Sequence, residues 1–217
     1  MNHAEQSLGL LARTIPGATR VFHAHHLDFC CGGKQTLQAA ADKAGLSAGE
    51  ISAQLQALQA GNDDVVDWTE AATPELIEHI LTRYHARHRE QLPELIRLAS
   101  RVESVHGDRP ECPRGLADHL MTMMHNLEEH MQKEELILFP LYLQGFAHPD
   151  IPPVQVMRHE HDQHGESLSR LEALTDGITL PKGACNTWRA LYLGLQTLRE
   201  DLMAHIHLEN NVLFERG

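Results

Sequence analysis

Aromatic residues, basic residues and long apolar runs are all scarce in this chain of 217 residues. Only 5% of the residues are aromatic, whereas leucine, alanine and histidine are frequent, a balance that favours helix over sheet. The 18 Lys and Arg residues are outnumbered by 30 Asp and Glu residues. Nucleic acids and anionic membrane surfaces both require a concentrated positive surface. The net charge of −12 therefore argues against either as the main partner.

The chain also lacks the sequence features of membrane and exported proteins. No apolar run reaches the roughly 18 residues that a membrane-spanning helix needs. The first twenty residues contain neither the basic start nor the apolar stretch of a signal peptide. Four cysteines, two of them adjacent, do not form the disulfide framework of a small secreted protein. We therefore expect a cytoplasmic protein.

Residues 1–60 are predicted to form a small helical unit. Its helices are expected at Leu8–His26, at Lys34–Ala44 and after Ser47, a candidate N-cap with Glu50 three residues further on. The motif Cys30-Cys31-Gly32-Gly33 lies between the first two helices. Residues 61–73 are rich in acidic and turn residues, and we interpret them as a linker.

Residues 74–217 contain four long amphipathic patterns. They begin at Thr73-Pro74, after Pro113, after Pro152-Pro153 and near Leu191. Apolar residues recur in steps of three and four, which places them on one buried stripe of each helix. Because the linkers are short to moderate, the expected fold is all-α, an up-down-up-down bundle of four helices.

What the chain has in excess is histidine, with 17 residues, and several of these occur in a repeated pattern. His130 and Glu134 are spaced H-x3-E, as are His205 and Glu209, so each pair shares one helix face. Upstream, H-x2-H-x-E begins at His85 and again at His161. The His85–His161 interval is 76 residues and the His130–His205 interval is 75. Such spacing is typical of a duplicated helical pair in which each copy supplies half of a site.

These residues lie on the buried stripes, where polar groups require partners. Burying four imidazoles and two carboxylates without a metal would cost several kcal/mol, unless the six groups satisfied one another. Imidazole and carboxylate ligands without a thiolate suit iron or manganese better than structural zinc. Two carboxylates can also bridge two metal ions. The pattern therefore predicts a two-metal site.

Three other histidines are predicted to lie outside the set of ligands. His88 and His164 occur three residues after His85 and His161, and we expect them to line the site. His106 follows His85 by 21 residues, which corresponds to about 31 Å along a continuous helix. We therefore expect His106 near the helix end, far from the metals.

The order of histidine before glutamate on four antiparallel helices resembles the hemerythrin-like family. With Cys30-Cys31-Gly32-Gly33-Lys34 ahead of the bundle, the chain resembles the repair-of-iron-centres family along essentially its whole length. Further matching stretches are Arg83–His85, His88–Leu95 and Leu208–Phe214. These are bacterial di-iron proteins linked to the recovery of iron–sulfur clusters after nitric oxide or peroxide damage.

The resemblance implies a site with two iron ions, bridged by an oxo group and by carboxylates. The iron ligands that it implies are His85, His130, Glu134, His161, His205 and Glu209. Glu134 and Glu209 would be the bridging residues.

The resemblance also implies redox chemistry, or transient binding of iron or NO, at Cys30 and Cys31. Two other interpretations stay open, a buried apolar pair and a structural detail at the start of a helix. Adjacent cysteines seldom form an unstrained disulfide with each other, so exchange with a partner is the more plausible redox chemistry.

The function that the resemblance implies is repair of iron–sulfur clusters after nitrosative or oxidative stress. Iron donation, NO binding and reduction, or both would carry it out, with damaged iron–sulfur proteins as partners and NO or O₂ as small ligands. The alternative is a hemerythrin-like O₂ or NO sensor or carrier without turnover, which would not need paired thiols. The sequence does not decide whether the chain is an enzyme or which electron donor it uses. It also does not decide the oligomeric state, a homodimer included.

Overall fold

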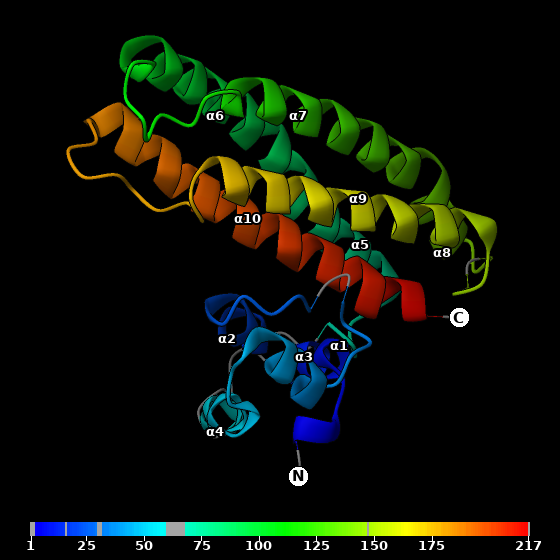
Figure 1. Cartoon of the computed structure of the whole chain (residues 1–217). Helices are drawn as coiled ribbons and strands as arrows, with labels where there is room; N and C mark the ends of the chain where they lie inside the picture. The colour runs from blue at the N-terminus through cyan, green and yellow to red at the C-terminus, as the bar shows by residue number, and fades with distance from the viewer. Residues whose placement is uncertain (1–2, 16, 30–31, 60–67, 147, 217) are drawn as a thin grey trace.

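The computed structural model describes residues 3–15, 17–29, 32–59, 68–146 and 148–216, and no β-strand occurs among them. Figure 1 shows four long helical rods side by side and a smaller helical unit packed below them. Each rod runs opposite to the one before it in the chain. The predicted all-α fold, with a helical N-terminal unit and a four-helix bundle, is therefore confirmed.

The N-terminal unit contains α1 (Leu8–Thr14), α2 (Ala18–Ala24), α3 (Leu37–Ala44) and α4 (Ala48–Gln59). The single helix predicted from Leu8 to His26 is wrong, because α1 and α2 are separate. Gly17 lies between them with a φ of +84°, which glycine adopts without strain. The predicted cap of α4 is confirmed, since Ser47 Oγ accepts a hydrogen bond from the amide of Glu50.

The segment before α3 pairs with the start of α1. The amide of Leu8 donates to the carbonyl of Gln35, and the amide of Gly9 donates to that of Gly33. The helix predicted from Lys34 therefore begins later, at Leu37, where Thr36 caps it.

The bundle consists of four rods. The first joins α5 (Thr73–His79), the π-helical η2 (Ile80–His85) and α6 (Ala86–His106). The second joins α7 (Leu116–Lys133), the π-helical η3 (Glu134–Leu138) and α8 (Phe139–Leu143). The third is α9 (Pro152–Leu174), and the fourth is α10 (Asn186–Asn211).

Two apolar layers fill the bundle interior. The larger layer includes Leu95, Leu120, Leu171 and Leu195. The smaller layer lies nearer the other end and includes Ile80, Leu138, Met157 and Leu213. Burial of such side chains stabilises the fold by roughly 1.5–3 kcal/mol each. Along every rod the candidate ligands fall where one layer gives way to the other.

The N-terminal unit packs against the last turns of α10, the red end of the bundle in Figure 1. The Phe29 ring lies edge-on to the His207 ring, with centroids 5.6 Å apart. At Gly9 a Cβ would lie only 2.3 Å from Asn211 Oδ1, so the Asn211 side chain would have to shift to admit a larger residue. In the described part of the chain, every helix is too short or too polar to cross a membrane.

Candidate metal centre

Six polar side chains from all four rods meet between the two apolar layers. They are His85, His130, Glu134, His161, His205 and Glu209, each at most 1% exposed. The repeated pattern therefore identified side chains that are distant in sequence and adjacent in the fold.

The six side chains form two groups that share both glutamates. One group is His85, Glu134, His205 and Glu209, and the other is His130, Glu134, His161 and Glu209. Within each group the ligand atoms lie within 4.8 Å of one another. This arrangement offers two adjacent metal positions, each with two imidazoles and two shared carboxylates.

The imidazoles converge through their Nε2 atoms. Nε2 of His85 lies 3.1 Å from Nε2 of His205, and Nε2 of His130 lies 3.0 Å from Nε2 of His161. One carboxylate oxygen of Glu209 lies 3.1 Å from His205 Nε2, and the other lies 3.1 Å from His161 Nε2. Glu209 therefore spans both groups, as a bridging ligand must.

The carboxylates themselves test whether the site fits a metal. Glu134 lies 3.4 Å from Nε2 of His85 and 3.4 Å from Nε2 of His130. Among the described residues, however, neither oxygen of Glu134 has a hydrogen-bond partner. Buried carboxylates in that situation are costly unless a cation binds them. The donor set therefore fits metal ions.

Burial sets the protonation of the site. It is the main cause that lowers the pKa of His85 and of His130 to about 4, so both imidazoles are neutral at physiological pH. Burial and the charge of Glu209 raise the pKa of Glu134 well above its usual range. For Glu209, burial alone would raise the pKa. The imidazoles of His205 and His161 outweigh this effect and lower the pKa well below its usual range.

Two carboxylates outside the six orient the imidazoles. Nδ1 of His85 lies 2.8 Å from Glu135 Oε1, and Nδ1 of His130 lies 3.0 Å from Glu160 Oε2. A proton on Nδ1 leaves the Nε2 lone pair directed into the site. Arg89 holds Glu135 in place with a 2.9 Å hydrogen bond.

A third imidazole is held by an amide. Nδ1 of His161 lies 2.9 Å from Asn210 Oδ1. Our sequence-based prediction missed these three supporting residues. All of them are immediate sequence neighbours of a predicted ligand, and a carboxylate or amide at such a position was the available signal.

His88 and His164 lie against ligand rings without joining either group. The His88 ring centroid is 5.3 Å from that of His205, and the His164 centroid is 4.9 Å from that of His130. His106 ends α6, with Nε2 3.2 Å from Cys185 Sγ. All three therefore lie outside the two groups, as expected.

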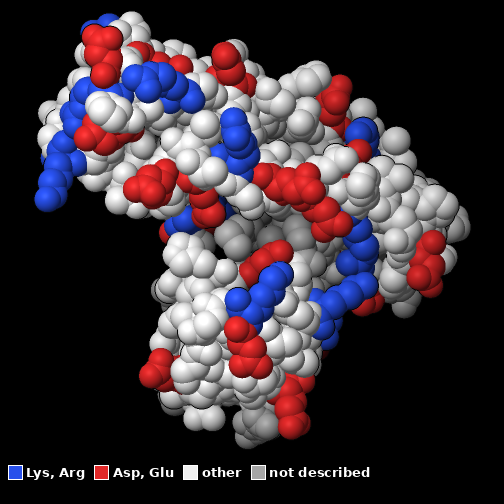
Figure 2. Space-filling view, in the orientation of Figure 1, with Lys and Arg blue, Asp and Glu red and all other residues white. Residues whose placement is uncertain are grey.

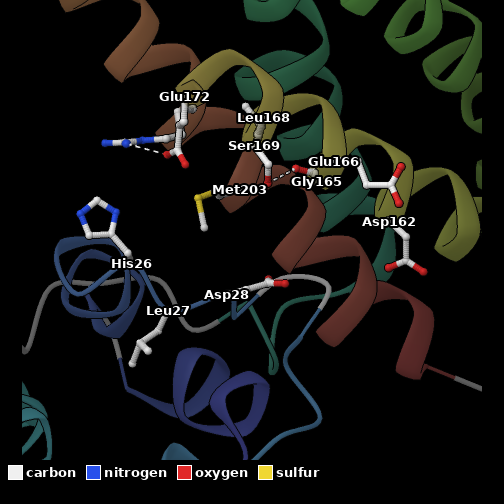
Figure 3. Close-up of a pocket in the computed structure, with 11 residues that line it drawn as sticks. His26, Leu27, Asp28, Asp162, Gly165, Glu166, Leu168, Ser169, Glu172 and Met203 are labelled. Atoms are coloured by element: carbon white, nitrogen blue, oxygen red, sulfur yellow. Dashed lines mark hydrogen bonds and ion pairs between the residues drawn. The ribbon is translucent and has the colours of Figure 1, made fainter. Parts of the chain in front are cut away.

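Cys30 and Cys31 lie outside the described residues. Near them in sequence, Asp28 accepts a hydrogen bond from the amide of Gly32. A cavity of about 400 Å³ separates this part of the N-terminal unit from α9 and α10. Figure 3 shows Asp28 and Asp162 on its opposite sides.

Comparison with known proteins agrees with this geometry. A family model described as the hemerythrin HHE cation binding domain matches residues 76–216, and one described as a domain of unknown function (DUF542) matches residues 4–59. Similar proteins from Yersinia pseudotuberculosis, Pectobacterium atrosepticum and Yersinia pestis are each named iron-sulfur cluster repair protein YtfE. Each is 52% identical over 217 residues, which cover 100% of this chain and 98% of the relative. A hemerythrin-like domain implies iron binding, and the buried histidines and glutamates offer the ligands. This chain therefore belongs to the hemerythrin HHE cation-binding family and, within it, to the iron–sulfur cluster repair proteins.

Proposed function

We propose that this protein repairs iron–sulfur clusters damaged by nitrosative or oxidative stress, and that its bundle holds two iron ions for this purpose. The observation that carries the proposal is the pair of buried groups that share Glu134 and Glu209. The names of the three relatives support cluster repair as the function.

We assign the same six side chains to the two ions. His85 and His205 would bind one ion, His130 and His161 the other, and Glu134 and Glu209 would bridge them. Such a pair, with an oxo bridge, would supply one-electron chemistry and positions open to NO or O₂. Ligation without thiolates also favours iron that can be released to a damaged cluster.

The protein's own contribution is orientation and exclusion of water. Glu135, Glu160 and Asn210 accept from the Nδ1 side of three imidazoles, which fixes the nitrogen that faces inward. The two apolar layers keep bulk water from the site, which strengthens the attraction between carboxylates and bound cations.

The N-terminal unit distinguishes repair from simple ligand carriage. We assign residues 1–60 to this unit, residues 61–73 to the linker and residues 74–217 to the bundle. Cys30 and Cys31 would act as redox thiols or hold iron or NO in transit to a client protein. A cytoplasmic location, where damaged iron–sulfur proteins are found, belongs to the same proposal.

Metal analysis and an optical spectrum of aerobically purified protein test the metal centre. The expected result is about two iron ions per chain with absorption from an oxo bridge. Protein purified with about one iron per chain, or with none after reconstitution, would contradict the assignment.

Repair is tested with an iron–sulfur protein whose cluster has been damaged by NO. Replacing Cys30 and Cys31 together with Ser should leave the di-iron spectrum intact, because the bundle supplies all six ligands, and should impair repair. The matched control replaces Cys112 and Cys185 with Ser. Unchanged repair by the first variant would indicate that the thiols are structural. Absence of repair by the native protein would favour the alternative function, an O₂ or NO sensor or carrier.

A further inference from the structure

A second cavity lies between the N-terminal unit and the bundle, beside the end of α10. Its volume is about 420 Å³, within the range of small-molecule sites. In Figure 2 the surface is hollowed between the N-terminal unit and the bundle, and basic and acidic side chains border this hollow. The charged residues that line this cavity are Arg13, Lys34, Arg158, Asp162 and Glu215.

Backbone rather than side chains forms part of the cavity wall. Gly9 and Gly33 line it and are joined by a 2.8 Å hydrogen bond between the amide of Gly9 and the carbonyl of Gly33. Both glycines pack against Asn211, where a Cβ would lie 2.3 Å and 3.1 Å from Oδ1, respectively. This close backbone packing brings the cations of the N-terminal unit up to the bundle.

Arg158 and Glu215 neutralise each other. An Nη2 atom of Arg158 lies 2.8 Å from a carboxylate oxygen of Glu215, and Nη1 donates to the carbonyl of Asn210. This pair therefore adds no net charge to the cavity.

The other three charges remain available to a ligand. Arg13 donates only to the carbonyl of Asn211 at 3.3 Å within the described ranges, so most of its guanidinium donors are free. Lys34 and Asp162 are exposed, and neither forms an ion pair or a side-chain hydrogen bond with another described residue. The cavity thus offers two cations from the N-terminal unit and one carboxylate from α9.

We propose that this cavity binds a small peptide-like zwitterion with two carboxylates and one ammonium group. Arg13 and Lys34 would bind the carboxylates, and Asp162 would bind the ammonium group. Charge-assisted hydrogen bonds of this kind are roughly twice as strong as neutral ones, and the guanidinium fork suits a carboxylate. Because the charges come from both parts of the protein, the ligand would bridge them.

The position of the cavity links it to the metal centre. Its wall includes Asn210, the residue whose side chain lies 2.9 Å from Nδ1 of His161. A bound ligand would therefore lie against the residue that orients a candidate metal ligand. The recognition itself rests on the three charges and is independent of the proposed repair activity.

Calorimetric titration of the metal-loaded full chain tests the proposal with two probes. The tripeptide γ-glutamyl-alanyl-glycine carries the three charged groups and has no thiol to react with iron. Glutarate carries two carboxylates and no ammonium group. We expect the tripeptide to bind more tightly than glutarate.

Two substitutions separate the roles of the charges. Lys34→Gln should weaken the binding of both probes by about tenfold. Asp162→Asn should weaken the binding of the tripeptide by about tenfold and leave the affinity for glutarate unchanged or higher. The matched controls, Lys182→Gln and Asp150→Asn, remove exposed charges outside the cavity and should change neither affinity. Circular dichroism confirms that each variant is folded.

Three results would overturn the proposal. The first is no binding of the tripeptide at about 5 mM, well above a millimolar Kd. The second is tripeptide affinity that Asp162→Asn leaves unchanged, which would remove the ammonium site. The third is tighter binding of glutarate than of the tripeptide, which would make the ligand a simple dicarboxylate.

Discussion

Replacing Glu134 with Gln should have opposite effects on the protein without and with metal. The substitution preserves the shape of the side chain and removes its charge. Burial and Glu209 raise the pKa of Glu134 above that of an unfolded carboxyl group. For such a group, the stabilising contribution is present below the ordinary carboxyl pKa and is lost as the pH rises towards the folded value. At pH of about 8 the metal-free variant should therefore be more stable than the native protein, by roughly 1–3 kcal/mol.

With iron bound, the native protein should instead be more stable than the variant. A ligand at a concentration of about 100 Kd stabilises the folded state by about 2.7 kcal/mol per site, or about 5 kcal/mol for two sites. Glu134 belongs to both four-residue groups, so its loss weakens both sites. If each affinity falls by about a hundredfold, the same iron concentration stabilises the variant by only about 0.4 kcal/mol per site.

Urea unfolding followed by circular dichroism measures this inversion. Anaerobic samples are compared with a chelator and with ferrous iron. Glu129→Gln serves as the control, because Glu129 is an exposed residue of α7 on the same rod. It should change neither the stability of the metal-free protein nor its stabilisation by iron. A metal-free Glu134→Gln variant that is less stable than the native protein would show that protein groups satisfy this carboxylate. Equal stabilisation of both proteins by iron would refute its role as a bridge.

Three further outcomes follow from the geometry. His106→Ala should keep its full iron content and its spectrum, whereas His85→Ala should lose iron in a colorimetric assay, because only His85 lies in a four-residue group. Glu209→Ala should lower bound iron more than His164→Ala, since a shared carboxylate serves both metals and His164 only lies against a ligand ring; equal iron in both variants would contradict this. Gly9→Ala should leave iron unchanged and accelerate proteolysis of the N-terminal unit, because its Cβ would lie 2.3 Å from a side chain of α10.

The bundle was predictable because each rod carries its own periodic signal. Steps of three and four place Leu120, Leu127 and His130 on one face of a helix whatever the other helices do. The repeat then relates the faces of different helices, and the family resemblance selected from them the six residues that converge. That these six bind metal stays a prediction until metal is measured.

Features that depend on how the helices are rotated against each other could not be predicted in this way. The pairing of His85 with Glu135 and of His130 with Glu160 depends on which helix faces which, and periodicity within one helix does not contain that information. The π-helical turns that end at His85 and begin at Glu134 were not predicted either. The break between α1 and α2 had a local signal, since Pro16-Gly17 is a common turn sequence.

Three consecutive residues at the end of α10 face three different parts of the molecule. Glu209 reaches both groups of candidate ligands, Asn210 holds the imidazole of His161, and Asn211 contacts the glycines of the N-terminal unit. Insertion or deletion of one residue before them would rotate all three by about 100° around the helix axis. The last turns of α10 therefore cannot change length during evolution without disturbing the metal ligands and the N-terminal contact together. Natural variation in length should instead collect in the loops between the rods.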